Sequence, residues 1–101
     1  MMSMTLKFEW DQEKAAGNYQ KHRIGFEEAQ TVFEDENARI FPDEAHSADE
    51  DREIIIGTSS KQRILLVCFI ERRRDVVRII SARRATRNER KDYEDYLSRA
   101  G

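Results

Sequence analysis

Arginine is the residue type in this chain that is best suited to chemistry, and it is concentrated in one stretch. Residues 72–91 hold nine Lys or Arg and two acidic residues, Asp75 and Glu89, although the whole chain has a formal net charge of -2. A guanidinium can hold two phosphate oxygens at once through its planar fork. This stretch therefore indicates a polyanionic partner, unless the arginines form a solvated face that pairs with acidic residues elsewhere.

The arginines gather where the last predicted strand meets the last predicted helix. Arg78 and Arg83 lie five positions apart, and a strand period of two would place them on opposite faces of the sheet. They can share a site only if the strand ends before Arg83. Amides at a helix start also favour anions. The phosphate-binding candidates are Arg63, Arg78, Arg84, Arg87 and Arg90, with a solvated helix face as the alternative for the last two.

Few side chains are available to move protons beside these arginines. His46 and Glu50 lie in an irregular acidic segment, and a histidine titrates near neutral pH. Either both take part in acid–base chemistry, or they bond to the backbone and hold the loop in shape. His22 ends a predicted helix, and we expect it and the tyrosines Tyr19 and Tyr96 to be structural.

Other chemistries lack the residues that they need. The four glycines are isolated and form no phosphate-binding loop. Two histidines and one cysteine are too few for a zinc site, so we expect no metal and no cofactor. Cys68 lies in an apolar run over residues 64–70, where a buried thiol acts as a small hydrophobe. A bilayer needs about 18 to 20 apolar residues. We therefore expect no membrane segment and, without a secretion signal, a cytoplasmic protein.

The elements that position these residues follow from hydrophobic periodicity. With 101 residues, 39% apolar and 38% charged, the chain is expected to form a single domain over residues 1–101. Asp11 can cap the first helix, and Thr86 and Glu89 have the spacing of a capping box. The β-α-α-β-β-β-β-α order predicts an α+β fold with helices on one face of an antiparallel sheet. The predicted strands cover residues 6–10, 38–41, 52–57, 63–70 and 76–82, and the helices 12–22, 26–33 and 86–99.

A set of residues with characteristic spacing also runs through the chain. It comprises Phe8–Asp11, Lys14, Asn18, Lys21–His22, Phe26, Glu28–Ala29, Val32–Phe33, Asp35, His46, Glu50, Arg52, Ile56–Gly57, Ser59, Arg63, Leu65, Arg78–Arg83, Ala85–Thr86, Glu89–Arg90 and Tyr93. In this order and spacing, residues 6 to 93 or so resemble the BrnT toxins of bacterial type II toxin-antitoxin systems. Arg23, where that family usually has glycine, and Arg84, where lysine is common, depart from the pattern.

The resemblance implies a RelE-like fold, ribonuclease activity that arrests translation, and neutralisation by a BrnA-type antitoxin, through which alone DNA would be contacted. In RelE-like toxins a basic residue near the end of the last strand and a tyrosine of the final helix contribute to catalysis, and these positions correspond to Arg83 and Tyr93. The leading hypothesis is a metal-independent endoribonuclease that cleaves mRNA, with Arg83, His46, Glu50 and Tyr93 as catalytic candidates and the other arginines as RNA contacts. The alternative is a non-catalytic module, such as a degenerate toxin, that binds nucleic acid or an antitoxin.

Overall fold

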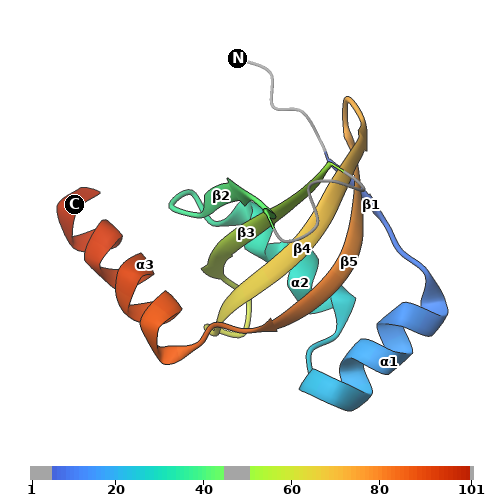
Figure 1. Cartoon of the computed structure of the whole chain (residues 1–101), viewed down its shortest axis with the longest axis horizontal. Coiled ribbons are helices and arrows are strands. Elements are labelled where there is room, and N and C mark those ends of the chain that lie inside the picture. The colour runs from blue at the N-terminus through green and yellow to red at the C-terminus, as the bar shows by residue number, and fades with distance from the viewer. Residues whose placement is uncertain (1–5, 45–50, 101) are drawn as a thin grey trace.

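Five strands and three α-helices make up residues 6–44 and 51–100, the part of the chain that the computed structural model describes (Figure 1). The predicted α+β class is confirmed. The catalytic candidates His46 and Glu50 lie outside the described residues. None of the described helices is long and apolar enough to span a membrane. The elements are β1 (Lys7–Glu9), α1 (Gln12–His22), α2 (Phe26–Thr31), a 3-10 turn η1 (Val32–Glu34), β2 (Arg39–Pro42), β3 (Arg52–Thr58), β4 (Ile64–Arg73), β5 (Val76–Arg84) and α3 (Arg87–Ala100).

The strands form one mixed sheet in the order β1-β5-β4-β3-β2. β2 to β5 are antiparallel neighbours, whereas β1 runs parallel to β5, with Phe8 opposite Val77. The prediction of a purely antiparallel sheet is therefore wrong at one edge. The alternation of residues 6–10 indicates a strand, but this alternation is the same for both strand directions.

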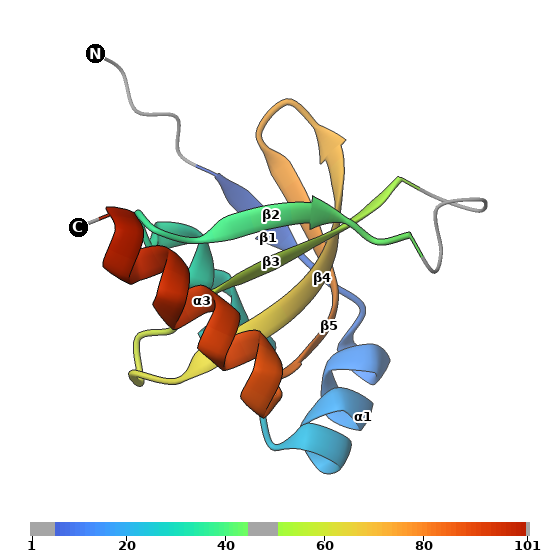
Figure 2. The ribbon, with the colours of Figure 1, turned by 60° about the vertical axis from the view of Figure 1, so that its left-hand side comes forward.

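Helices cover both faces of the sheet, and the prediction of a single helical face is wrong. Ile55 belongs to the main core with Phe26 and Val32, whereas the next residue, Ile56, packs in a second cluster with Tyr93. Successive residues of a strand point to opposite faces. β3 carries three isoleucines in a row, so both of its faces are apolar and both need cover. α1 and α2 lie on one side of the sheet and α3 on the other (Figure 2).

Local signals fix both ends of α1. The Asp11 carboxylate accepts hydrogen bonds from the backbone N–H groups of Glu13 and Lys14 at 2.8 and 3.2 Å, which confirms the predicted cap. The helix ends at Arg23, whose backbone is left-handed with φ 60° and ψ 29°. Glycine adopts this conformation without steric cost. This accounts for the glycine that the family with the matching pattern usually has at this position.

Gly57 lies where β3 passes closest to η1. A Cβ atom on Gly57 would stand 2.9 Å from Oδ2 of Asp35, 3.0 Å from Cβ of Ala38 and 3.1 Å from Cγ1 of Val32. We expect Gly57→Ala to lower the free energy of unfolding by about 1–3 kcal/mol through overpacking, as measured by urea denaturation. Gly17→Ala is the control: its Cβ meets nothing within 4 Å, and alanine in mid-helix should add about 0.5–1 kcal/mol. Unchanged stability in Gly57→Ala would contradict the close contact.

Candidate functional site

A bulge in β5 places Arg78 and Arg83 on the same face of the sheet. Arg78 lies opposite Ile70 and Arg83 opposite Leu66, two residues of β4 that share a face, because Ile80 is an extra residue with no partner on β4. The expectation from a strand period of two, that Arg78 and Arg83 lie on opposite faces of the sheet, is wrong. β5 continues through Arg83, and the bulge reverses the alternation instead.

Arg83 is held by Glu89, in the first turn of α3. Its two terminal nitrogens donate hydrogen bonds to the two carboxylate oxygens of Glu89 at 2.9 and 3.0 Å. Glu89 also accepts from the backbone N–H of Thr86 at 2.8 Å, and its own N–H donates to the Thr86 hydroxyl at 3.2 Å, so the predicted capping box is confirmed. The hydrogen bonds that Arg83 donates to Glu89 raise the pKa of Arg83. The Arg83 side chain is 37% exposed, so an oriented cation remains open to a ligand.

Three further arginines around the junction of β5 and α3 have no carboxylate partner among the described residues. Arg84, Arg87 and Arg90 are exposed, and none of them makes an ion pair or side-chain hydrogen bond within residues 6–44 and 51–100. Arg84 and Arg90 line a cavity of about 340 Å³ together with Arg63, which we call the basic cavity. Its other lining residues are Gln62, Ile64, Ala85 and Glu94. Positive charge that is not neutralised by the protein attracts phosphate.

Arg63 is bound to a buried carboxylate on α2. Its Nε donates to Oε2 of Glu28 at 3.0 Å and its Nη2 donates to Oε1, while the Ser59 hydroxyl donates to Oε2 at 2.6 Å. Burial alone would raise the pKa of Glu28, but the hydrogen bonds from Arg63 and Ser59 outweigh burial and lower it. Arg63 therefore joins α2 to the β3–β4 turn at the edge of the basic cavity.

Arg78 is also paired, with Glu9 on the neighbouring strand β1. Its Nη1 donates to Oε2 of Glu9 at 3.2 Å, and Nε of Arg72 lies 4.0 Å from the same oxygen. The five predicted RNA-binding arginines therefore fall into two groups. Arg63 and Arg78 are neutralised by carboxylates, whereas the three around the β5–α3 junction have no such partner in the described part of the chain.

Tyr93 of α3 is buried, with 2% of its surface exposed. Its hydroxyl donates to Oδ2 of Asp35 and lies 3.3 Å from the Thr58 hydroxyl, while the Thr58 N–H donates to the same carboxylate oxygen at 2.8 Å. Burial and then the bond to Asp35 raise the pKa of Tyr93, so the hydroxyl stays protonated. These bonds join α3 to β3 and to the end of η1.

Asn18 is a positioning residue that the sequence analysis did not single out for a role. Its side-chain Nδ2 donates to the carbonyls of Ala82 at 2.8 Å and Ile24 at 3.0 Å, and its Oδ1 accepts from the Ala82 N–H at 3.1 Å. β1 runs beside β5 only as far as Arg78, so the Asn18 amide replaces a strand partner next to Arg83. The sequence feature that could have pointed to Asn18 is its position on α1, because it lies three residues after Ala15 and so on the side of the helix that faces the core.

The described residues contain no metal site. Within residues 6–44 and 51–100, no three His, Cys, Asp or Glu side chains gather closely enough to hold an ion. Cys68 is buried, as predicted, and burial followed by the contact with Asp43 raises the pKa of its thiol to about 11. A thiol with this pKa stays protonated near neutral pH and is not a nucleophile.

Comparison with known proteins agrees with the sequence pattern. The family model described as the ribonuclease toxin BrnT of a type II toxin-antitoxin system matches residues 10–89. The chain belongs to the BrnT family. The 1.1 Å crystal structure of the ribonuclease toxin BrnT from Brucella abortus is 28% identical to this BrnT-family chain, with a TM-score of 0.65, and the match covers 82% of this chain and 100% of that one. No curated protein matches.

Membership of the BrnT family shows the general activity of the chain and the class of protein that is its partner. It is a ribonuclease toxin of a type II toxin-antitoxin system, which implies an antitoxin. The BrnT match includes Arg83, Arg84 and Arg87 but ends before Arg90 and Tyr93. Any role assigned to Arg90 or Tyr93 therefore has to be argued from its contacts and exposure in this structure and not from the family match.

Proposed function

We propose that this BrnT-family toxin is a metal-independent endoribonuclease that cleaves mRNA in the cytoplasm, arrests translation and is neutralised by a BrnA-type antitoxin. In the proposal, residues 1–101 form one RelE-like toxin domain. The observation that supports the proposal is the arrangement of arginines at the junction of β5 and α3. There, an arginine oriented by Glu89 lies beside three arginines that have no carboxylate partner within residues 6–44 and 51–100.

The proposed reaction is attack of a ribose 2′-OH on the adjacent phosphodiester. The bond from the 2′-oxygen to phosphorus forms as the bond from phosphorus to the 5′-oxygen breaks, which leaves a cyclic phosphate and a free 5′-OH. A base accepts the 2′-OH proton and an acid donates one to the 5′-oxygen. Arg83 suits the stabilisation of the negative charge that develops on the non-bridging phosphate oxygens, because Glu89 has already oriented its guanidinium.

The three arginines around the β5–α3 junction that have no carboxylate partner among the described residues would hold the phosphates that flank the cleaved bond. Arg84 and Arg90 already line one cavity, and Arg87 lies between them in sequence. Each phosphate contact releases a counterion, so RNA binding should weaken steeply as the salt concentration rises. Arg63 and Arg78 would act at the edges of this surface, where their charges are shared with Glu28 and Glu9.

His46, Glu50 and Tyr93 are the candidates for the proton transfers, and the structure describes only Tyr93. Its hydroxyl is buried and already donates to Asp35, so a direct transfer to RNA would require this bond to break. We expect Tyr93→Phe to lower the free energy of unfolding by about 1–2 kcal/mol. We expect cleavage to fall by less than about tenfold, whereas His46→Ala should cost about 100-fold. Initial cleavage rates and thermal melts check both; a 100-fold loss in a folded Tyr93→Phe would instead make Tyr93 a catalytic acid or base.

The proposed function is tested by inducible expression in a bacterium, with growth followed beside primer extension on abundant mRNAs. We expect growth arrest with new RNA ends, and cleavage of RNA by the purified chain in the presence of a chelator. Arrest without new RNA ends would overturn the nuclease assignment. Salt-sensitive RNA binding without cleavage products would show the non-catalytic module instead.

The RNA surface is tested separately, with an oligonucleotide whose 2′-OH groups are blocked. We expect Arg90→Glu to weaken its binding by about tenfold or more, because the substitution replaces an attractive charge with a repulsive one. Arg74→Glu makes the same charge change in the exposed β4–β5 turn and is the matched control. Equal loss of binding in the two variants would place the RNA elsewhere.

A further inference from the structure

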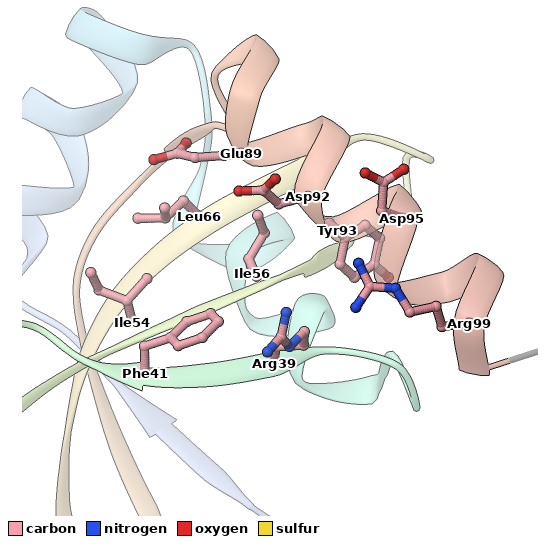
Figure 3. Close-up of a pocket in the computed structure, with 10 residues that line it drawn as sticks. All are labelled: Arg39, Phe41, Ile54, Ile56, Leu66, Glu89, Asp92, Tyr93, Asp95 and Arg99. Carbon is pink, nitrogen blue, oxygen red and sulfur yellow. The ribbon is translucent and has the colours of Figure 1, made fainter.

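A groove separates α3 from the face of the sheet that α1 and α2 leave uncovered (Figure 3). The groove, which we call the α3 groove, has a volume of about 490 Å³. Apolar side chains of β2, β3 and β4 form its floor, and carboxylates of α3 form one wall. The floor residues are Phe41, Ile54, Ile56 and Leu66, the acidic wall residues are Glu89, Asp92 and Asp95, and Arg39, Tyr93 and Arg99 complete the lining.

The floor of the α3 groove is incompletely covered. Ile54 and Leu66 are only half-buried, and Phe41 is 40% exposed. At one end, the Arg39 guanidinium lies 4.9 Å from the centre of the Phe41 ring and 4.4 Å from that of Tyr96, so it joins β2 to α3. Exposed aliphatic and aromatic side chains gathered in one groove are typical of a site that binds apolar side chains.

Carboxylates along one side of α3 give that side of the α3 groove negative charge, while two arginines, Arg39 and Arg99, also line the groove. Glu89, Asp92 and Asp95 follow one another at three-residue intervals along one side of α3. Asp92 has no partner among the described residues, and Asp95 makes only an exposed contact of 3.8 Å with Lys91. Carboxylates repel phosphate and attract Lys or Arg. The part of the groove beside Asp92 and Asp95 therefore fits an apolar protein segment that carries basic residues.

We propose that the α3 groove binds a basic amphipathic helix of the antitoxin. This inference rests on the proposed function, because a toxin-antitoxin system supplies the protein partner. Apolar side chains at positions i, i+3, i+4 and i+7 of that helix would enter the floor of the groove. Lysines or arginines beside them would pair with Asp92 and Asp95. Glu94, not Asp92, lines the basic cavity, so the antitoxin and the RNA held in that cavity would lie on opposite sides of α3, with Arg83 at the end of the groove that Glu89 lines.

Glu89 connects the α3 groove to Arg83. Its carboxylate lines the groove and accepts both hydrogen bonds from the Arg83 guanidinium. A basic side chain that enters this end of the groove competes with Arg83 for that carboxylate. Binding at the groove would therefore release Arg83 from the orientation that the proposed reaction needs.

The test uses the full chain and two synthetic helical peptides of about 14 residues, four turns each. Both carry leucines on one face; the cationic peptide has lysines on its flanks, and the acidic peptide has glutamates in their place. We expect the cationic peptide to bind at least about tenfold more tightly and to shift the NMR signals of Ile54 and Leu66. Asp92→Arg should weaken it about tenfold. Glu94→Arg makes the same charge change on the other side of α3 and is the matched control. We expect its affinity for the cationic peptide to equal that of the wild-type chain.

Equal binding of the two peptides, or equal losses in Asp92→Arg and Glu94→Arg, would overturn the charge selectivity of the groove. In cells, Asp92→Arg should still cleave RNA but resist the antitoxin that rescues the unchanged toxin. Full neutralisation of Asp92→Arg would overturn the antitoxin as the occupant. Selective peptide binding by a chain that cleaves no RNA would support the groove and count only against the proposed nuclease.

Discussion

Arg83→Ala should abolish growth arrest and lower the rate of RNA cleavage by about 100-fold or more, because it removes the oriented donor proposed to stabilise the reacting phosphate. The measurements are growth after induction, primer extension and initial cleavage rates in vitro. Arg83→Lys keeps the charge but loses the bidentate fork that Glu89 orients, so it should recover only a small part of the activity. Full toxicity of Arg83→Ala would remove Arg83 from the active site.

The loss of activity in Arg83→Ala should occur without unfolding. The Arg83–Glu89 pair is about one-third exposed, and exposed ion pairs contribute about 0.2–1 kcal/mol. Glu89 would also keep its hydrogen bond to the Thr86 backbone, so α3 remains capped. A thermal melt and a circular dichroism spectrum check this. Arg74→Ala, in the exposed β4–β5 turn, is the activity control.

Arg63→Ala should have the largest effect on stability. It leaves the buried Glu28 carboxylate with only the Ser59 hydroxyl, and breaking a buried pair costs about 3–5 kcal/mol. In a domain of this size, that loss corresponds to a fall in Tm of more than about 10 °C. Arg84→Ala is the matched control, because Arg84 lines the same cavity and has no partner in the described part of the chain. Its loss should change stability by less than about 0.5 kcal/mol. Similar melting temperatures for the two variants would contradict the structural role of Arg63.

The free energy of unfolding that Arg63→Ala removes should become smaller as the pH falls. The folded chain holds the pKa of Glu28 below its usual value of 4.5, so the pair stabilises fully above that value. Its contribution disappears as the pH falls through the folded pKa and the carboxylate becomes protonated. The difference in unfolding free energy between the unchanged chain and Arg63→Ala should therefore shrink on acidification. A difference that stays constant from about pH 7 to pH 3 would contradict this.

Features set by neighbouring residues could be predicted from the sequence. α1 begins and ends where the sequence predicts, because its Asp11 cap and its termination at Arg23 depend on residues a few positions away. The start of α3 follows from the Thr86–Glu89 capping box for the same reason. Local hydrogen bonds therefore make helix ends the most predictable features of this chain.

Features that depend on distant residues could not be predicted. The parallel pairing of β1 with β5 joins strands from opposite ends of the chain. The carboxylate partner of Arg63 is 35 residues away and that of Arg78 is 69 residues away, so the sequence gives no sign that these two charges are already neutralised. Residue type indicated which side chains suit phosphate binding, but only the fold distinguishes the paired from the unpaired arginines.

Because β5 contains the extra residue Ile80, a deletion or insertion in this strand should disturb the fold as much as an unfavourable substitution does. If Ile80 were deleted, the strand would regain an uninterrupted alternation, and the parts on either side of the deletion could not both keep their present faces. Either Val77 would leave the core and Arg78 would enter it, or Ala82 and Arg83 would exchange sides. Evolution within this strand should therefore proceed by substitution and not by insertion or deletion. A relative without the bulge would have to carry its phosphate-facing arginine one position earlier or later in the sequence.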